Sequence, residues 1–259
     1  TTTTTTAASS SSSVRRSTHG DNSSSAGPND TEEEEEAHAV GLATLVLGDV
    51  GLCEGLGLKL VSQGLSQNNS LTDLRLPGNR FGDSEVEELS EALRSHKRLT
   101  LLNLSGCNLG DLGARSLASA MATHASLQVL MLGNNRIADG GAGSIGRAIE
   151  TNETLRELHL NDNAITESGF NALFTPLRFN SCLTLLNLAG NTFHNQADSN
   201  SKDCKAAAAL SLTLKFNVSL QELDLSRCRM RDQGIVDGTA KPVATPPAAA
   251  AAAAAADRK

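Results

Sequence analysis

Leucines recur along this chain in a fixed frame of eleven residues. The clearest copy has Leu155, Leu158, Leu160, Asn163 and Ile165, with mostly polar residues between the leucines. The frame also begins at Leu71, Leu99, Leu127 and Leu183, so that four successive steps are each 28 residues long. Less regular copies begin at Leu42 and Leu220. Seven copies in one frame predict a repeat protein in which every unit folds in the same way.

The frame is typical of a short strand followed by a turn. Its fourth and sixth positions are leucine, and side chains two residues apart lie on the same side of a strand. We therefore expect these leucines to point into the core and the residues between them to point outward. The ninth position is Asn or Cys in the regular copies. A short amide or thiol there can bond backbone groups that a tight turn would otherwise bury without a partner.

Between the frames the apolar spacing changes to that of a helix. Counted from each first leucine, positions 16, 19 and 23 are apolar, as in Val86, Leu89 and Leu93. Spacings of three and four residues place these side chains on one helical face. The corresponding residues of the later repeats are Ala114, Leu117 and Met121; Ala142, Ile145 and Ile149; Phe170, Leu173 and Leu177. Each repeat is thus predicted to be a strand, a turn and a helix of about ten residues.

Polar residues mark both ends of these helices. An acidic residue precedes each one, and we expect it to cap free N–H groups at the positive end of that helix. These residues are Asp83, Asp111, Asp139 and Glu167. Position 26 is always Asn or His, the non-glycine residues that best tolerate the left-handed conformation at a helix C-terminus. These residues are Asn68, His96, His124, Asn152, Asn180 and Asn217, and this role makes glycosylation of the sequons at Asn152 and Asn217 the less favoured interpretation.

Three repeats depart from the pattern. The first carries one extra residue in its Gly-rich loop and aligns Leu58, Val61 and Leu65 only when counted from the next repeat. The sixth is nine residues longer, and the extra residues fall in a polar loop within 194–205 that is either a binding element or tolerated drift. Counting back from Leu220 predicts Ala207, Leu210 and Leu214 as the buried face of its helix. The seventh places Ile235 at position 16 but Pro242 inside the expected helix, which that proline prevents from completing.

Composition divides the chain into three parts. Residues 1–39 are a Thr/Ser-rich and acidic tail that we expect to be disordered, although the run Glu32 to Glu36 could open a short capping helix. Residues 40–237 form the repeat domain, with its last repeat incomplete, and residues 238–259 form a low-complexity Pro/Ala tail. Most of the net charge of −7 arises from the first tail. The repeat domain is nearly neutral, and with no Trp or Tyr it does not favour a nucleic-acid partner.

The cysteines predict reduced thiols. There are five, with no C-x-x-C pair, and Cys107 and Cys228 occupy turn positions four strands apart. That separation, roughly 20 Å, is too long for a disulfide. We therefore expect a cytoplasmic location. No apolar run approaches 18 residues, so no membrane span is expected.

The seven frames and the Gly/Asp-rich segments after them, such as Leu109 to Gly113 and Ile137 to Gly141, resemble the ribonuclease-inhibitor-like leucine-rich repeats. That family includes ribonuclease inhibitor, the sensor regions of NOD-like receptors and the Ran GTPase-activating protein. The resemblance covers residues 42–237 and implies an α/β solenoid (horseshoe) of 28-residue repeats, with parallel strands on the concave face and helices on the convex face. The chain lacks the phosphate-binding loop of NOD-like receptors and the acidic tail of the Ran activator.

No cofactor, metal site or catalytic group is expected. His159 stands near Glu157 and Asp162, but these are better interpreted as solvated neighbours than as a general base and its partners. The six histidines and five cysteines lack metal-ligand spacing. The glycine-rich segment 48–57 lacks the Lys and Ser/Thr of a phosphate-binding loop and is better interpreted as a loose loop.

The residues that remain as a candidate site are those that alternate with the core leucines on the concave face. Exposed apolar residues with a polar rim favour protein binding, whereas residues that merely suit a solvent-facing strand are the alternative. The candidate residues are Arg75, Leu101, Asn103, Val129, Met131, Glu157, His159, Leu185, Asn187, Glu222 and Asp224.

We therefore predict a non-enzymatic module that binds a protein partner on the concave face, as the sensor or scaffold part of a larger NOD-like-receptor-type protein. The resemblance to the Ran activator implies an alternative, a GTPase-activating module acting through loop residues. Arg80, Arg136 and Arg229 share position 10 of the repeat, although solvated turn residues are the simpler interpretation. A GTP-hydrolysis assay with small GTPases separates the two classes.

Overall fold

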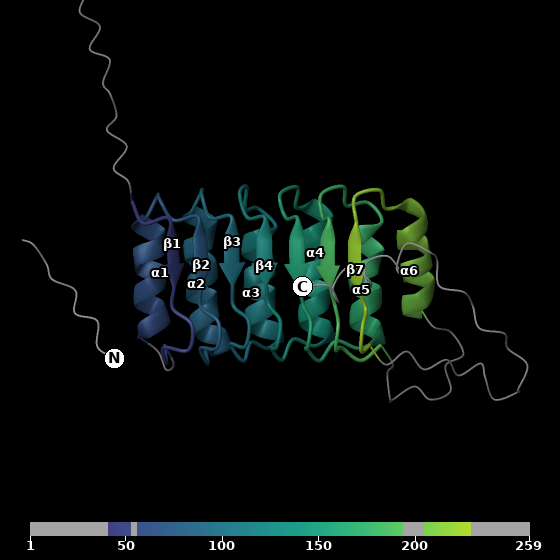
Figure 1. Ribbon diagram of the computed structural model, residues 1–259, viewed down its shortest axis with the longest axis horizontal. Coiled ribbons are helices and arrows are strands. Elements are labelled where there is room, and N and C mark those ends of the chain that lie inside the picture. The colour runs from purple at the N-terminus through teal and green to yellow at the C-terminus, as the bar shows by residue number, and fades with distance from the viewer. Residues whose placement is uncertain (1–40, 53–55, 194–204, 229–259) are drawn as a thin grey trace, which may run out of the picture. The chain divides into compact units, whose positions relative to one another are not determined.

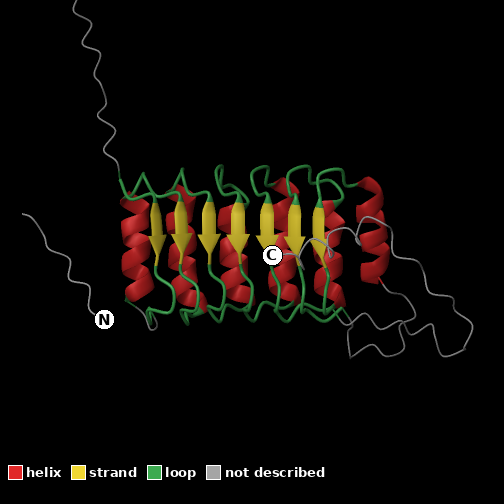
Figure 2. Ribbon diagram, viewed as in Figure 1, coloured by secondary structure: helices red, strands yellow, loops and turns green. Residues whose placement is uncertain are grey.

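The computed structural model describes residues 41–52, 56–193 and 205–228, in which strands and helices alternate along the chain (Figures 1 and 2). The strands are β1 (Thr44–Val46), β2 (Asp73–Arg75), β3 (Leu101–Asn103), β4 (Val129–Met131), β5 (Glu157–His159), β6 (Leu185–Asn187) and β7 (Glu222–Asp224). The helices are α1 (Gly57–Gln67), α2 (Asp83–Ser95), α3 (Asp111–Met121), α4 (Asp139–Thr151), α5 (Glu167–Leu177) and α6 (Lys205–Phe216). The predicted tails, the sixth-repeat insertion and the residues after Cys228 lie outside the described residues.

The strands form one parallel sheet in the order β1 to β7, with the helices on one side of it (Figure 2). Each strand pairs with the next repeat in direct register, so that Leu102 lies beside Leu130 and Leu130 beside Leu158. Equal positions of successive repeats therefore stack on one another. The fold is the predicted α/β leucine-rich-repeat solenoid, with its sheet open on the face turned away from the helices.

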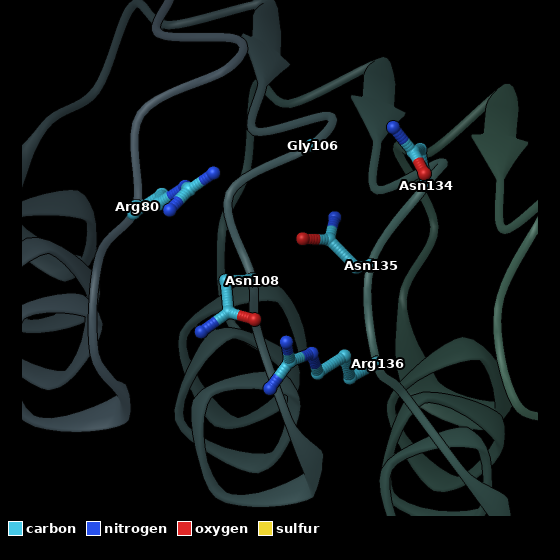
Figure 3. Close-up of a pocket in the computed structure, with 6 residues that line it drawn as sticks. All are labelled: Arg80, Gly106, Asn108, Asn134, Asn135 and Arg136. Carbon is cyan, nitrogen blue, oxygen red and sulfur yellow. The ribbon is translucent and has the colours of Figure 1, made fainter. Parts of the chain in front are cut away.

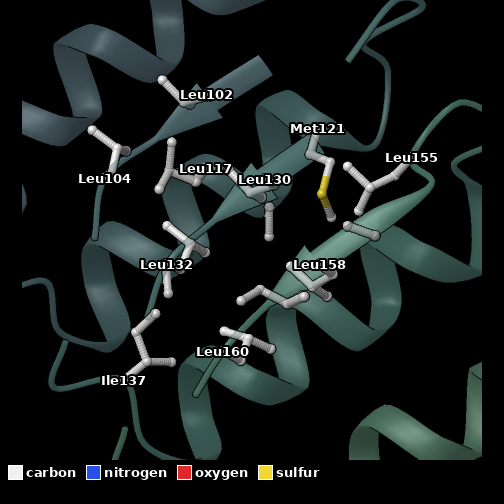
Figure 4. Packing of buried hydrophobic residues seen from close by; sticks show 14 of the residues in the cluster. Leu102, Leu104, Leu117, Met121, Leu130, Leu132, Ile137, Leu155, Leu158 and Leu160 are labelled. Carbon is white, nitrogen blue, oxygen red and sulfur yellow. The ribbon is translucent and has the colours of Figure 1, made fainter. Parts of the chain in front are cut away.

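The core is built from the leucines that the frame places inside (Figure 4). In the second to sixth repeats the leucines at positions 4 and 6 are at most 1% exposed. The predicted faces of α1 to α5 are also buried, with Val61 partly so. Each inner repeat is covered by a neighbour on both sides, whereas an end repeat is covered on one side only. The equivalent leucines of the end repeats, Leu45, Leu47, Leu223 and Leu225, are therefore only partly buried.

The predicted buried face of α6 is wrong at Ala207 and Leu214, while Leu210 is partly buried against the core. Ala206, Ala209 and Thr213 are buried, whereas Ala207 is exposed and Leu214 is 67% exposed. The Thr213 hydroxyl donates a hydrogen bond to the carbonyl oxygen of Phe174 on α5 (2.8 Å). Among the described elements α6 packs only on α5, so its buried face is the one turned to that helix rather than the one the repeat count predicts.

Polar side chains at position 9 bond backbone groups of the turns, as predicted, and they also join each repeat to the one before it as a ladder, which was not predicted. Asn135 donates to the carbonyl oxygens of Leu104 and Leu132 and accepts from the N–H groups of Cys107 and Leu109, at 2.9–3.0 Å. Cys107 and Cys228 take the same place as free thiols that donate to the preceding repeat. Burial raises the pKa of Cys107 to about 12, so this thiol stays protonated and unreactive.

The sharp turn itself occurs one position earlier than the sequence pattern indicates. The backbone has a positive φ at position 8 of every described repeat, in a region that favours Gly, Asn and Asp. The residues concerned are Asp49, Gly78, Gly106, Asn134, Asp162, Gly190 and Arg227. Six of the seven are of those residue types, so this column carried a signal that the leucine frame did not use.

Three of the acidic residues at the helix starts, Asp83, Asp111 and Asp139, cap the next repeat rather than their own helix, which corrects the prediction for them. Asp83 accepts hydrogen bonds from the N–H groups of Gly110 and Gly113 (3.1 and 3.0 Å) at the start of α3. Asp139 accepts from Thr166 and Gly169 (2.7 and 3.0 Å) at the start of α5. Each carboxylate reaches across because the direct register places the next helix N-terminus beside it. The caps therefore join repeats together.

The residues at position 26 are not left-handed, so that prediction is also wrong. At Asn68, His96 and Asn152 φ is −88°, −78° and −80°. Their side chains act instead: the Asn152 oxygen accepts from the N–H groups of Thr154 and Leu155, and its nitrogen donates to the carbonyl oxygen of Met121. Position 26 thus forms a second polar ladder between repeats.

Two histidines occupy this ladder at His96 and His124, and both are buried. Each accepts hydrogen bonds at Nδ1 from two backbone N–H groups, so the imidazole proton is on Nε2. Neither Nε2 atom forms a hydrogen bond of good geometry with a described residue, although the backbone of His96 lies close enough to His124 to oppose part of the lowering of the His124 pKa. Burial, followed by the charges of Arg98 at His96 and of His96 and Lys97 at His124, lowers the pKa of both side chains from 6.5.

We expect acid to destabilise the fold through these histidines. Their pKa is lower in the folded state than in the unfolded chain, so the unfolded chain binds more protons below pH 6.5 and the stability falls as the pH drops through that value. Changing both to Asn, the residue of the neighbouring repeats, should keep the backbone bonds and remove this titration. Thermal melts from pH 7.5 to 5.0 should show a smaller loss of Tm in H96N/H124N than in the wild type. Equal losses would assign the acid sensitivity to other groups.

Candidate functional site

The candidate residues lie in two parallel rows on the open face of the sheet. Strand register places position 3 of each repeat in one row and position 5 in the other. The first row contains Leu101, Val129, Glu157, Leu185 and Glu222, and the second contains Arg75, Asn103, Met131, His159, Asn187 and Asp224. The register thus arranges all eleven residues as neighbours on one surface, from β2 to β7.

Three of the four apolar candidates form a contiguous group, which we call the central patch: Leu101, Val129 and Met131. Leu101 lies beside Val129 in the register of β3 and β4, and Met131 is two residues along β4. Leu185 is separated from this patch by Glu157 on β5. All four side chains are half-buried rather than fully exposed as expected.

A pair of polar side chains flanks the central patch on each side, an ion pair on β2 and a histidine–carboxylate contact on β5. On β2, Arg75 lies 2.8 Å from Asp73, and this hydrogen bond raises the pKa of the guanidinium. On β5, His159 Nε2 lies 3.7 Å from Glu157 Oε2. The His159 and Glu157 pair is thus a surface pair on one strand face, as the sequence indicated. The open face carries an apolar centre with charged neighbours on both sides.

Three candidates in the second row bond their own backbone. Asn103, Asn187 and Asp224 each accept a hydrogen bond from the N–H group two residues further on, at 2.8–3.0 Å. Such bonds end a strand locally. One side-chain oxygen of each residue is therefore occupied, and these three residues contribute mainly to the shape of the strand ends.

Two of the three arginines of the GTPase alternative line one pocket at the carboxyl ends of β2 to β4 (Figure 3). The pocket has a volume of about 400 Å³ and is lined by Arg80, Gly106, Asn108, Asn134, Asn135 and Arg136. Arg229 lies outside the described residues. The GTPase alternative expected an arginine or asparagine from these loops, but the sequence pattern did not single out Asn108, which shares position 10 with the two arginines, or Asn134. Asn135 was assigned to the turn at position 9.

No three His, Cys, Asp or Glu side chains within 41–52, 56–193 and 205–228 are grouped so as to hold a metal ion. In the same ranges, no helix is long and apolar enough to cross a membrane.

Comparisons with known proteins agree with the class of fold. A family model described as "Leucine Rich repeat" matches residues 97–118, 123–146, 151–174 and 216–237. The repeats, the single parallel sheet and this match define a leucine-rich-repeat solenoid. No curated protein sequence matches the chain significantly.

Solved structures similar to this chain include three with low sequence identity. The C-terminal domain of a tropomodulin from Caenorhabditis elegans is 15% identical over 61% of this chain and 93% of that one, with a TM-score of 0.48. Leiomodin-1 actin-binding site 2 is 20% identical over 51% and 74%, with a TM-score of 0.40. Pollen receptor kinase 3 is 16% identical over 74% and 78%, with a TM-score of 0.39.

Proposed function

We propose that this chain is a non-enzymatic module that binds a protein partner on the open face of its sheet. The observation that carries the proposal is the central patch, an apolar surface between the Arg75–Asp73 and His159–Glu157 pairs. Apolar centres with polar rims are typical of protein interfaces. The free thiols of Cys107, Cys182 and Cys228 are compatible with the reducing, cytoplasmic location predicted for it.

The geometry suits binding because the patch is held by rigid elements. Its side chains project from paired strands whose opposite side is a packed core. Little conformational entropy is therefore lost when a partner orders this surface. Met131 adds an unbranched, polarizable side chain that can adapt to a partner's shape.

We also propose that the repeats are of the ribonuclease-inhibitor-like type. Helices of 11 to 13 residues in the described repeats support the ribonuclease-inhibitor-like type. The sensor role in a larger NOD-like-receptor-type protein stays a prediction from that resemblance.

Charging the central patch should abolish partner capture with little change in stability. In V129K/M131K the ammonium introduced at position 129 would lie beside Glu157, the register partner on β5, so the sheet should tolerate it. An aspartate at the same position would instead add repulsion with Glu157. We expect loss of the specific partners recovered by pull-down and mass spectrometry, while the melting temperature changes by a few degrees at most.

The matched control makes the same kind of change on the helices. Leu60 and Leu112 are 57% and 58% exposed on α1 and α3. L60K/L112K should keep partner capture. If this variant loses capture and V129K/M131K keeps it, the binding surface lies on the helical side and the proposal is wrong.

GTPase activation is the second candidate, and the observation that favours it is the pocket shared by Arg80 and Arg136. An arginine supplied to a transferring phosphate can accelerate GTP hydrolysis strongly. Hydrolysis by purified small GTPases, measured with and without the chain, separates this activity from simple binding. Acceleration that disappears in R80A/R136A would replace the binding-only proposal.

A further inference from the structure

The pocket at the carboxyl ends of β2 to β4 is rich in charged donors that have no partner. Arg80 and Arg136 are exposed and form no ion pair or side-chain hydrogen bond with any residue the structure describes, although Arg75, Arg94 and Arg227 are each paired with a carboxylate. Among the residues that the structure describes, no carboxylate lines the pocket. The arrangement leaves two positive charges facing one hollow.

The acidic residues that follow the pocket loops in sequence accept hydrogen bonds at helix starts instead of pairing with the arginines. Asp83 follows the loop that carries Arg80, and its carboxylate accepts hydrogen bonds from the N–H groups of Gly110 and Gly113. Asp111 follows the loop that carries Asn108, and its carboxylate accepts a hydrogen bond from the N–H group of Ala138. In the next repeat Asp162 pairs with Arg227 at 3.1 Å. The described lining therefore carries two positive charges and no negative one, the carboxylate of Asp49 lying beside Gly78 in the neighbouring turn, and the ligand of the pocket should be an anion.

The asparagines distinguish between kinds of anion. Asn108 and Asn134 are exposed, and their side-chain amides form no hydrogen bond with the residues that are described, whereas Asn135 is fully used by the position-9 ladder. An amide presents both a donor and an acceptor. A peptide backbone complements both at every residue, whereas a phosphate presents mainly acceptors.

The spacing of the arginines also matches a peptide. Arg80 and Arg136 occupy the same position two repeats apart, so their backbones are separated by about 10 Å along the sheet. Acidic residues two or three apart in an extended segment are about 7–10 Å apart. Each guanidinium can take one carboxylate through two parallel N–H bonds.

We propose that this pocket binds an acidic segment of a protein partner, with carboxylates on Arg80 and Arg136 and backbone amides on Asn108 and Asn134. The inference rests on the proposed function, since it names the chemistry of the partner. The pocket begins three residues beyond the ends of β3 and β4, at Gly106 and Asn134, next to the central patch. One partner can therefore cover both surfaces, placing apolar side chains on the sheet and an acidic segment at its edge.

The test uses a fluorescent peptide of alternating Glu and Ala and a matched peptide of alternating Gln and Ala, titrated with the full chain at low salt. The wild type should bind the Glu peptide and not the Gln peptide, and R80Q/R136Q should weaken binding about tenfold. The control R98Q/R115Q removes the same charge at two exposed arginines outside the pocket and should leave the affinity unchanged.

Equal affinities of R80Q/R136Q and the wild type for the Glu peptide would overturn the inference. Stronger binding of inorganic phosphate than of the peptide, lost in R80Q/R136Q, would also overturn it by assigning a phosphate site. Loss of partner capture in V129K/M131K with no effect of R80Q/R136Q on the peptide would reject this inference and leave the proposed function standing.

Discussion

Replacing Leu158 by alanine is expected to lower the free energy of unfolding by about 2–5 kcal/mol. Leu158 is 0% exposed at position 4 of the fifth repeat and lies beside Leu130 in the core (Figure 4). Its other strand neighbour, Leu186, is also buried. The cavity cannot close easily, since β5 is hydrogen-bonded to a strand on either side. Urea unfolding followed by circular dichroism measures the loss.

An exposed leucine provides the control for Leu158. Leu112 on α3 is 58% exposed, and L112A should change the stability by less than about 0.5 kcal/mol. If L158A and L112A unfold at the same urea concentration, Leu158 does not occupy the core position assigned to it.

Replacing Gly146 by alanine should cost about 1–3 kcal/mol, although alanine is the better helix former. Gly146 is buried on α4 where α5 passes closely, and a Cβ atom there would overlap the carbonyl oxygen of Ala172. That oxygen belongs to backbone, so the two helices must separate. The separation would loosen the packing of two central repeats. Thermal melts and urea unfolding should both report the loss.

Gly143, three residues earlier on α4, is the matched control. A Cβ atom there would lie 3.8 Å from the Cβ atom of Ala172, an ordinary contact. G143A should therefore stabilise the protein by up to about 1 kcal/mol through helix propensity alone. The opposite signs expected for two Gly-to-Ala changes on one helix test the close approach directly, and equal signs would contradict it.

Most of the fold could be predicted because the same local pattern of apolar and polar residues recurs in every repeat, so that each copy supports the same assignment. Leu74, Leu102, Leu130, Leu158 and Leu186 stand at one position of a 28-residue frame, and all are at most 1% exposed. A period of two predicts the strands and spacings of three and four predict the helices, whatever surrounds them. The same alternation identified the two rows of the open face.

The partners of the polar residues could not be predicted in the same way. Asp83 and Asp139 were expected to cap their own helices, but they bond N–H groups 27 and 30 residues further along the chain. A pattern within one repeat indicates that a carboxylate belongs near a helix start. It does not indicate which of two adjacent helix starts lies within reach, because that depends on how closely the repeats stack.

The candidate site could likewise be predicted only in part. The sequence placed Leu101, Val129 and Met131 on one face, but only the strand register makes them a single patch and sets Leu185 apart behind Glu157. Arg80, Asn108 and Arg136 share a column of the repeat, yet their common pocket depends on the turn geometry after three separate strands. Residue type and periodicity are local properties of the chain. Distances between repeats depend on packing, so they appear only in the folded solenoid.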